Sequence, residues 1–421
     1  MTPRFPLRAS RDDASAGDPV GPLTRRRLVG AGALGLFGAV VLTACGQDGG
    51  EDSASGAASA SATPTPTFTP KVTVTPQDGA SEYNPTAPVT VVTDAGRVKA
   101  VEVTGGKAVE GTISEDGRTW TAKGPLEFAK DYRVQYTIVN DDDVEHRGST
   151  GFATTSAADE ADLSFDFEDG GTYGTGQVIQ LNFSEPVTDK AAVEKAVTVT
   201  GAGDQEGKFR WYCDQMVRYR PKDKWAPNSQ VNVSIKLLGT DIGNGMIMNQ
   251  NYERSFKTGP KNYAYVDNNT KTMKIYESDK LTKEFPVTLG DPQWPSVTGQ
   301  LVVMEKAKSY FFDSRTLGLK PGDSHWYEPF YASNACRLTS SGAFVHQAEP
   351  SGYPYVGNTN ISHGCIGLLP DGAEYFFNTF RVGDVVETVN TGYGEADPDN
   401  GYGDWNIPFE HYQDASWKGN W

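Results

Sequence analysis

Short runs in which apolar and polar residues alternate fill the chain from Lys71 to about Gly259. Alternation with a period of two is typical of strands that bury one face. Turn sequences such as Asp94-Ala95-Gly96 separate the runs. The pattern predicts two small β-sandwiches, one over residues 71–158 and one over residues 159–259. The runs are Val72–Val74, Val89–Val92, Val98–Val103 and Tyr132–Val139, then Val178–Phe183, Phe209–Tyr219 and Val231–Leu238.

Residues 260–391 show a different pattern, which predicts a mostly β domain with one short helix. Tyr263–Val266 and Met273–Tyr276 flank an Asp-Asn-Asn turn, as the strands of a hairpin do. Asp371 has the character of a helix N-cap, with Glu374 three residues later at the position that completes a capping box. Asp384–Val389 is predicted to be the closing strand. The irregular segment 392–421 is expected to pack back onto this domain.

The first 45 residues have the composition of an export signal rather than of a folded domain. Arg25 and Arg26 form the arginine pair typical of a twin-arginine signal. Leu28–Leu42 is apolar but too short to span a membrane comfortably, and Leu42-Thr-Ala-Cys45 has the form of a bacterial lipobox. We expect lipid attachment at Cys45 and a place on the extracytoplasmic face of the membrane after Tat or Sec export. The alternative is a plain transmembrane anchor with a chance cysteine.

The amino-acid composition predicts a linker and argues against nucleic acid as a partner. Residues 46–70 are rich in Gly, Ser, Thr and Pro, which predicts a flexible linker that holds the folded part away from the membrane. The formal net charge is −16, and such an acidic balance argues against nucleic acid as a partner. The two sandwiches are interpreted either as spacers or as modules that contact glycan.

The candidate chemistry lies in one stretch of the third unit. The apolar run Ala343–Val345 predicts a buried strand that ends at His346, and fifteen loop-like residues then lead to Ser362-His363-Gly364-Cys365. A thiol attacks as its thiolate, so it needs a neighbour that takes its proton. We expect Cys365 to be a nucleophile with His346 as general base, and a neighbouring imidazolium to lower the thiol pKa below its usual value of about 8.5.

The other residues of this stretch have predicted supporting roles. Ser362 and Gly364 are expected to shape the turn, and the amide of Cys365 is the natural oxyanion donor. His346 taken alone has the alternative of a satisfied core histidine. A zinc site of His346, His363 and Cys365 is a further alternative, but no C-x₂-C or H-E-x-x-H motif accompanies these residues. The remaining histidines are predicted to be surface or packing residues, and these are His146, His325 and His411.

His-x₁₅-Ser-His-Gly-Cys resembles the signature of the L,D-transpeptidases, which remodel bacterial peptidoglycan. The likeness extends to Phe285–Gly290 and Gly403–Pro408, covers residues 71–421, and is greatest to members with two Ig-like domains before the catalytic one. It implies that Cys365 forms a thioester with a donor tetrapeptide stem, releases D-Ala, and passes the acyl group to a second stem in a 3→3 cross-link. It also implies that His363 is a third residue of the catalytic site, which mostly orders the turn and has direct participation in the chemistry as the alternative. Inhibition by carbapenems and the absence of a metal or organic cofactor are further implications. The alternatives are an L,D-carboxypeptidase, a wall-anchoring enzyme, and a degenerate wall-binding module.

Three positions depart from the family pattern. Gly367 stands where Asn is usual, Gln347 where Ser is frequent, and Leu317 where close relatives carry a lid tyrosine that supports the oxyanion. The candidates to replace that tyrosine are Trp326, Tyr327, Tyr331, Tyr353 and Tyr355, and all of these except Tyr327 are expected to line the substrate site.

Two cysteines remain outside the candidate site and the lipobox. Cys213 lies in the second predicted sandwich and Cys336 in the third unit. In an exported protein they could form a disulfide between these units. Two separate buried thiols are the equally weighted alternative.

Overall fold

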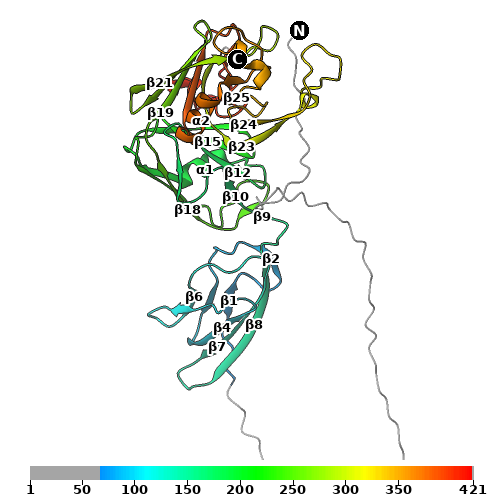
Figure 1. Cartoon of the computed structure of the whole chain (residues 1–421). Coiled ribbons are helices and arrows are strands. Elements are labelled where there is room, and N and C mark those ends of the chain that lie inside the picture. Colours follow the sequence, from blue (N-terminus) through cyan, green and yellow to red (C-terminus); the bar gives the residue numbers. More distant parts are fainter. Residues whose placement is uncertain (1–66, 420–421) are drawn as a thin grey trace, which may run out of the picture.

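The computed structural model describes residues 67–419 and is mostly β structure (Figure 1). The predicted signal, the lipobox at Cys45 and nearly all of the predicted linker lie outside the described residues. Within residues 67–419, the model contains no helix with the length and apolarity that a membrane crossing needs.

The first sandwich consists of two four-stranded sheets with strand orders β1-β3-β6-β5 and β2-β8-β7-β4. The inward side chains of both sheets form one core that includes Val91, Trp120, Val134 and Ile138. The strands are β1 (Val72–Thr75), β2 (Ala80–Tyr83), β3 (Thr90–Thr93), β4 (Arg97–Thr104), β5 (Gly111–Ile113), β6 (Thr119–Ala122), β7 (Asp131–Val139) and β8 (Glu145–Thr154).

The second sandwich has sheets of order β10-β12-β15-β14 and β11-β18-β16-β13, with a small parallel pair of β9 and β17. Its core includes Leu181, Val217, Val233 and Phe256. The elements are β9 (Glu160–Ala161), β10 (Leu163–Phe165), β11 (Gly171–Tyr173), β12 (Ile179–Phe183), α1 (Lys190–Ala196), β13 (Val197–Gly201), β14 (Gly207–Cys213), β15 (Met216–Pro221), β16 (Gln230–Ile235), β17 (Ile247–Met248) and β18 (Tyr252–Thr258).

Two features of the second sandwich differ from the prediction. The run Phe209–Tyr219 is not one strand but the hairpin of β14 and β15, which turns at Asp214 and Gln215. The short helix α1 was not predicted; Asp189 caps it by accepting a hydrogen bond from the amide of Ala192 at 3.0 Å.

The third unit is built on a nine-stranded sheet of order β22-β27-β19-β20-β21-β26-β25-β24-β23. Helix α2 packs across β24, β25 and β26. The elements are β19 (Asn262–Asp267), β20 (Thr272–Glu277), β21 (Lys280–Thr288), β22 (Gly299–Val302), β23 (Glu305–Phe312), β24 (Phe330–Arg337), β25 (Phe344–Gln347), β26 (Ile366–Leu368), α2 (Pro370–Thr379) and β27 (Val385–Val389), with 3₁₀ helices η1 (Ser314–Leu317), η2 (Pro350–Tyr355), η3 (Asp404–Asn406) and η4 (Phe409–His411).

The start of α2 corrects the predicted cap. Leu369 is the N-cap and makes no side-chain hydrogen bond, while Pro370 occupies the first turn and Asp371 lies inside the helix. Proline is preferred at this position because its missing N–H has no partner there in any case. The helix begins at Pro370, so the predicted capping box at Asp371 is wrong.

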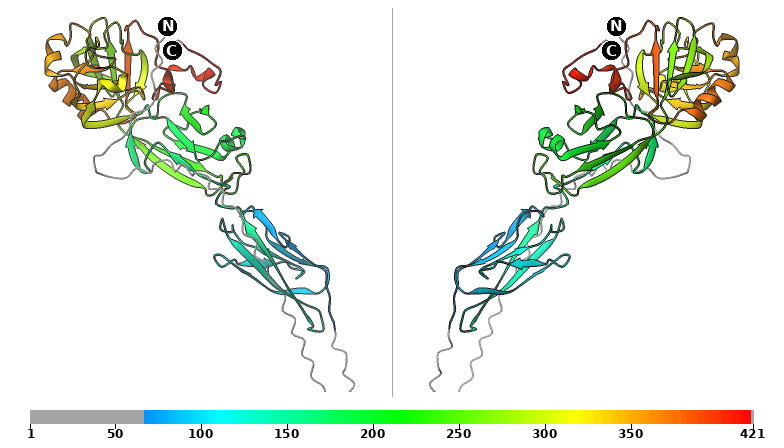
Figure 2. Two further views of the ribbon diagram at one scale, coloured as in Figure 1. Left: turned by 90° about the vertical axis from the view of Figure 1, so that its right-hand side faces the viewer. Right: turned by 90° about the vertical axis from the view of Figure 1, so that its left-hand side faces the viewer.

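The C-terminal segment bridges two units instead of packing on one. Its η3 meets β22, where the amide of Gln300 donates to Oδ1 of Asn406 at 2.7 Å. The same segment also covers the β14–β15 sheet, where Nη1 of Arg218 is 2.9 Å from Oδ2 of Asp404. In Figure 2 the C-terminal segment lies against the second sandwich, whereas the first sandwich stands apart. The second sandwich and the catalytic unit are therefore held together by the end of the described chain.

Candidate active site

The parallel pairing of β25 and β26 brings the two predicted catalytic residues together. Cys365 directly precedes β26, and His346 in β25 is in register with Gly367. Strands alternate their side chains between the two faces of a sheet. Val345 therefore packs into the core that includes α2, and Phe344 and His346 point to the other face. Cys365 clusters with Phe344 on that second face.

The turn before Cys365 is held by its own backbone and by Ser362. Gly364 has φ of +111°, a conformation that residues with a Cβ rarely adopt. The hydroxyl of Ser362 donates to the carbonyl oxygen of Cys365 at 2.6 Å and accepts from the amide of Gly364 at 3.1 Å. These contacts fit the predicted role of Ser362 and Gly364 in shaping the turn.

The imidazole of His346 has one nitrogen fixed by the main chain. Nδ1 lies 2.7 Å from the carbonyl oxygen of Gln347. A carbonyl oxygen can only accept, so Nδ1 carries the proton and Nε2 keeps its lone pair. The side chain of Gln347 is not needed for this, which agrees with the expectation that only its carbonyl matters.

Burial keeps both partners neutral in this arrangement. Cys365 and His346 are each 8% exposed. Desolvation raises the pKa of the Cys365 thiol to about 11, and it lowers the pKa of the His346 imidazole. The thiol's recorded hydrogen bond runs to the carbonyl oxygen of Gly342 at 3.7 Å. The expected lowering of the thiol pKa is thus wrong for this state, which pairs a thiol with a neutral base.

The lid, residues 313–329, connects β23 to β24 and brings Tyr327 to the site. Burial raises the pKa of Tyr327, and the charge of the Cys365 thiolate contributes in the same direction. The ring of Tyr327 lies 5.2 Å from that of His363, which is two residues before Cys365, whereas Leu317 lies in η1 at the start of the lid. Of the residues named to replace the lost tyrosine, Tyr327 fits best.

The four predicted substrate-binding residues differ in their contacts and in their exposure to solvent. The ring of Tyr331 packs against that of Phe311 in a tilted arrangement with the centroids 5.0 Å apart, on the face of the hairpin opposite to Phe312 and His346, and Tyr331 is 69% exposed. The structure does not bring Tyr331 to the thiol. The hydroxyl of Tyr353 accepts from Nε2 of Gln347 at 3.0 Å.

The other two of the four are Tyr355 and Trp326. Tyr355 is an exposed residue at the end of η2, and the indole of Trp326 donates to Glu328 at 3.1 Å.

His325 was predicted to be a surface or packing residue, and in the structure it packs against His363. Its carbonyl oxygen lies 2.7 Å from Nε2 of His363. Its ring is 5.7 Å from that of His363, and the rings of Tyr327 and Trp294 lie 5.2 Å and 5.5 Å from His363. No sequence motif indicated this contact with the catalytic turn, because it depends on the path of the lid.

The two leftover cysteines do not form a disulfide. Cys213 is exposed at the β14–β15 turn, and Cys336 is buried in β24. Desolvation raises the pKa of the Cys336 thiol to about 12. Of the two alternatives the structure supports separate thiols, of which only Cys336 is buried. Within residues 67–419, no three His, Cys, Asp or Glu side chains gather in a group that could hold a metal ion.

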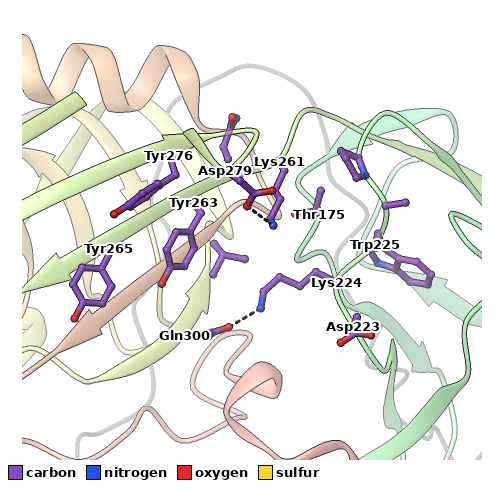
Figure 3. Close-up of a pocket in the computed structure, with 14 residues that line it drawn as sticks. Thr175, Asp223, Lys224, Trp225, Lys261, Tyr263, Tyr265, Tyr276, Asp279 and Gln300 are labelled. Carbon is purple, nitrogen blue, oxygen red and sulfur yellow. Dashed lines mark hydrogen bonds and ion pairs between the residues drawn. The ribbon is translucent and has the colours of Figure 1, made fainter. Parts of the chain in front are cut away.

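A cavity of about 750 Å³ lies between the second sandwich and the catalytic unit (Figure 3). Lys224 reaches across it to Gln300 at 2.7 Å, beside Tyr263. Burial lowers the pKa of Lys224 to about 8. The lining residues include neither Cys365 nor His346, so this cavity is not the place of the predicted chemistry.

Comparison with known proteins decides the family. The pattern of the L,D-transpeptidase catalytic domain matches residues 261–388, and that of a bacterial Ig domain matches residues 80–241. L,D-transpeptidase 2 of Mycobacterium tuberculosis is 32% identical over 351 residues, which cover 83% of this chain and 85% of that protein. The chain belongs to the L,D-transpeptidase family. L,D-transpeptidase 5 of the same organism is 27% identical over 414 residues, which cover 96% of this chain and 88% of that protein.

A solved L,D-transpeptidase in complex with imipenem is 30% identical, with a TM-score of 0.48, and the match covers 54% of this chain and 97% of that one. Membership of the L,D-transpeptidases makes this protein an acyltransferase. It also confirms the predicted fold class, in which an Ig-like part precedes a mostly β catalytic domain.

Proposed function

We propose that this L,D-transpeptidase cross-links peptidoglycan stems through a thioester on Cys365. The observation that supports the proposal is the parallel pairing of β25 and β26, in which His346 lies opposite Gly367, two residues after Cys365, together with the Nδ1 contact that leaves His346 Nε2 its lone pair. Nε2 takes the thiol proton as sulfur attacks the carbonyl of the L-centre of diaminopimelate in a donor tetrapeptide. The imidazolium then protonates the departing amine, which leaves as D-Ala.

The second half of the reaction reverses these steps. The side-chain amine of a second stem attacks the thioester carbonyl and gives a proton to His346. The new amide forms as the carbon–sulfur bond breaks, and the proton returns to the sulfur. The amide of Cys365 supports the oxyanion in both halves, together with the hydroxyl of Tyr327. His363 orders the turn, and Tyr353, Tyr355 and Trp326 are the proposed contacts to the stems.

Mass spectrometry of the intact protein after mixing with a tetrapeptide stem tests this mechanism. The expected result is a covalent adduct with loss of D-Ala, and a cross-linked dimer when an acceptor stem is added. Cys365→Ala should abolish both and Cys365→Ser nearly so, since a hydroxyl is a harder proton donor for the same base. Release of D-Ala by Cys365→Ala overturns the mechanism.

Three other functions are distinguished by the same experiment. An adduct that yields only free tripeptide identifies a carboxypeptidase, and transfer to a protein amine identifies a wall-anchoring enzyme. Absence of any adduct, with imipenem as well as with the stem, identifies a wall-binding module without catalysis. Carbapenems are proposed as inhibitors, as membership of the L,D-transpeptidase family implies.

We propose further that Cys45 carries a lipid that holds the enzyme on the extracytoplasmic face of the membrane. The proposal rests on Leu42-Thr-Ala-Cys45. Radiolabelled palmitate is expected to enter the wild-type protein and not Cys45→Ala. Label that persists in the variant contradicts the lipid anchor. Replacement of Arg25 and Arg26 by Lys is expected to block export if the twin-arginine route is used, and unchanged export points to the Sec route.

A further inference from the structure

One histidine of the lid joins three parts of the active site. The carbonyl oxygen of His325 lies 2.7 Å from Nε2 of His363. Because a carbonyl can only accept, His363 must carry its proton on Nε2. Burial lowers the pKa of His363, so the ring is favoured in its neutral form with the lone pair on Nδ1. The lid backbone therefore selects the tautomer of the histidine two residues before Cys365.

The side chain of His325 attaches the lid to Asp291 and Gln293. Its Nδ1 lies 3.0 Å from Oδ2 of Asp291, and its Nε2 lies 2.8 Å from Oε1 of Gln293. The side chains of His325 and Asp291 are 20% and 14% exposed, so the contact is shielded from solvent. Both ring nitrogens of His325 therefore have a hydrogen-bond partner in the segment 291–293.

Asp291 is in turn attached to the turn that carries the nucleophile. Its amide donates to the carbonyl oxygen of Ser362 at 2.9 Å, next to the bridge between Gly290 and Ser362. Its Oδ1 accepts from the amides of Gln293 and Trp294 at 2.7 Å and 3.1 Å. A continuous set of hydrogen bonds thus runs from the lid through His325 and Asp291 to Ser362.

The backbone of His325 supplies a second, independent observation. Its φ is +76°, in the left-handed region that residues with a Cβ rarely occupy, although Asn, Asp and His do so more often than the others. Such conformations persist where the surrounding contacts outweigh their cost, and they gather at functional sites. Asparagine suits the same backbone conformation but lacks the imidazole that contacts Asp291 and Gln293.

We propose that His325 is a positioning residue of this enzyme, which latches the lid to Asp291 and fixes His363, so that Tyr327 is held over the thiol of Cys365. This rests on the proposed function in so far as Cys365 is the nucleophile. Tyr327 follows His325 by two residues, and the start of the lid is fixed to it, since Oγ of Ser314 donates to the carbonyl oxygen of Tyr327 at 2.7 Å.

The test compares His325→Asn and Asp291→Asn with the wild type. His325→Asn keeps the left-handed backbone but is too short to bridge to Asp291. Asp291→Asn can keep the Oδ1 contacts to the two amides and loses the charge. His146→Asn in the first sandwich and Asp267→Asn at the end of β19 are the matched controls, because neither lies near the lid.

Two quantities are measured, the rate of acylation by imipenem and the rate of trypsin cleavage after Arg315, which is exposed in the lid. Both lid variants are expected to acylate about tenfold more slowly, the equivalent of one charge-assisted hydrogen bond, and to be cleaved correspondingly faster. The double variant should be no slower than the worse single one, because both changes break one set of contacts. The controls should match the wild type in both assays.

Three results overturn the proposal: unchanged acylation in both variants, slower acylation with unchanged cleavage of the lid, or additive effects in the double variant. Failure of the proposed function has a different signature. In that case the wild type itself forms no adduct, while faster cleavage of the variants still reports release of the lid. If His325→Asn does not fold, Asp291→Asn alone decides, by the same two rates.

Discussion

Burial determines the protonation states at the reaction centre. The neutral thiol of Cys365 and the neutral imidazole of His346 avoid a charge pair in a site that excludes water. The proton of Cys365 therefore moves to His346 when the substrate has arrived and the sulfur attacks, and not in the resting enzyme.

The alkylation of the three thiols by iodoacetamide is expected to follow their burial. Cys213 is exposed and should react first, Cys365 should react more slowly, and Cys336 should not react in the folded protein. The rate at Cys365 should keep rising with pH toward about 11, because only the thiolate attacks. Peptide mapping after timed exposure between pH 6 and pH 10 measures all three at once. A rate at Cys365 that exceeds that of Cys213 at pH 6 would indicate a preformed ion pair instead.

Tyr327→Phe is expected to slow acylation, since it removes the hydroxyl of the lid tyrosine near the sulfur. Loss of one oxyanion donor typically costs about 100–1000-fold in rate. Leu317→Tyr is expected to give no gain, because Tyr327 already serves the site. Stopped-flow measurement of acylation by imipenem checks both. Faster acylation by Leu317→Tyr, together with an unchanged acylation rate for Tyr327→Phe, would indicate that the oxyanion donor belongs at position 317 and not at Tyr327.

At the scale of elements, the strands were predictable where alternation is strong and unbroken. β3, β4, β7, β16, β19 and β20 coincide closely with predicted runs, because each has one face in a core. The β14–β15 hairpin was not predicted, since Asp214 and Gln215 make a turn without glycine or proline. The lid contacts of His325 were not predictable, because they join residues 34 and 38 positions apart through loops.

The departure at position 367 has a packing reason. A Cβ on Gly367 would come 2.8 Å from Cγ2 of Thr288 in β21 and 3.4 Å from Cβ of Ala348. Gly367→Asn, the residue usual in the family, is therefore expected to destabilise the fold by about 1–3 kcal/mol, as overpacking does. Thr288→Ser removes that methyl and keeps the hydroxyl that donates to Thr359, so the double variant should recover part of the loss. Thermal unfolding of the single and double variants measures this, and equal loss in both would contradict it.

At the scale of the whole molecule, a buried ion pair joins the second sandwich to the C-terminal segment. Arg218 and Asp404 are 5% and 0% exposed, and the hydroxyls of Tyr212 and Tyr412 both donate to Oδ1 of Asp404 at 2.7 Å. Nη1 of Arg218 also donates to the carbonyl oxygens of Pro398 and Gly401 at 2.8 Å. Every partner of the pair is therefore satisfied inside the interface.

Asp404→Ala is expected to lower the free energy of unfolding by about 3–5 kcal/mol, since it leaves the Arg218 charge buried without its partner. Asp214→Ala removes the partner of Lys190 at the surface of the same sandwich and should cost at most about 1 kcal/mol. Denaturant unfolding of the two variants gives the comparison. Equal small losses would mean that water reaches Arg218 when Asp404 is removed.

The same interface has a consequence for the order in which the chain folds. Arg210, Arg218 and Arg220 project from β14 and β15, and each is covered by groups that follow it by 180 residues or more. During synthesis the second sandwich is complete long before these groups exist, so it must present three uncovered guanidinium groups until residues 398–414 arrive. Contacts this distant in sequence form late, because the loop between them has to close first. Any nascent or C-terminally clipped form of this enzyme therefore displays a cationic sheet face, on an otherwise acidic protein, that the finished molecule hides.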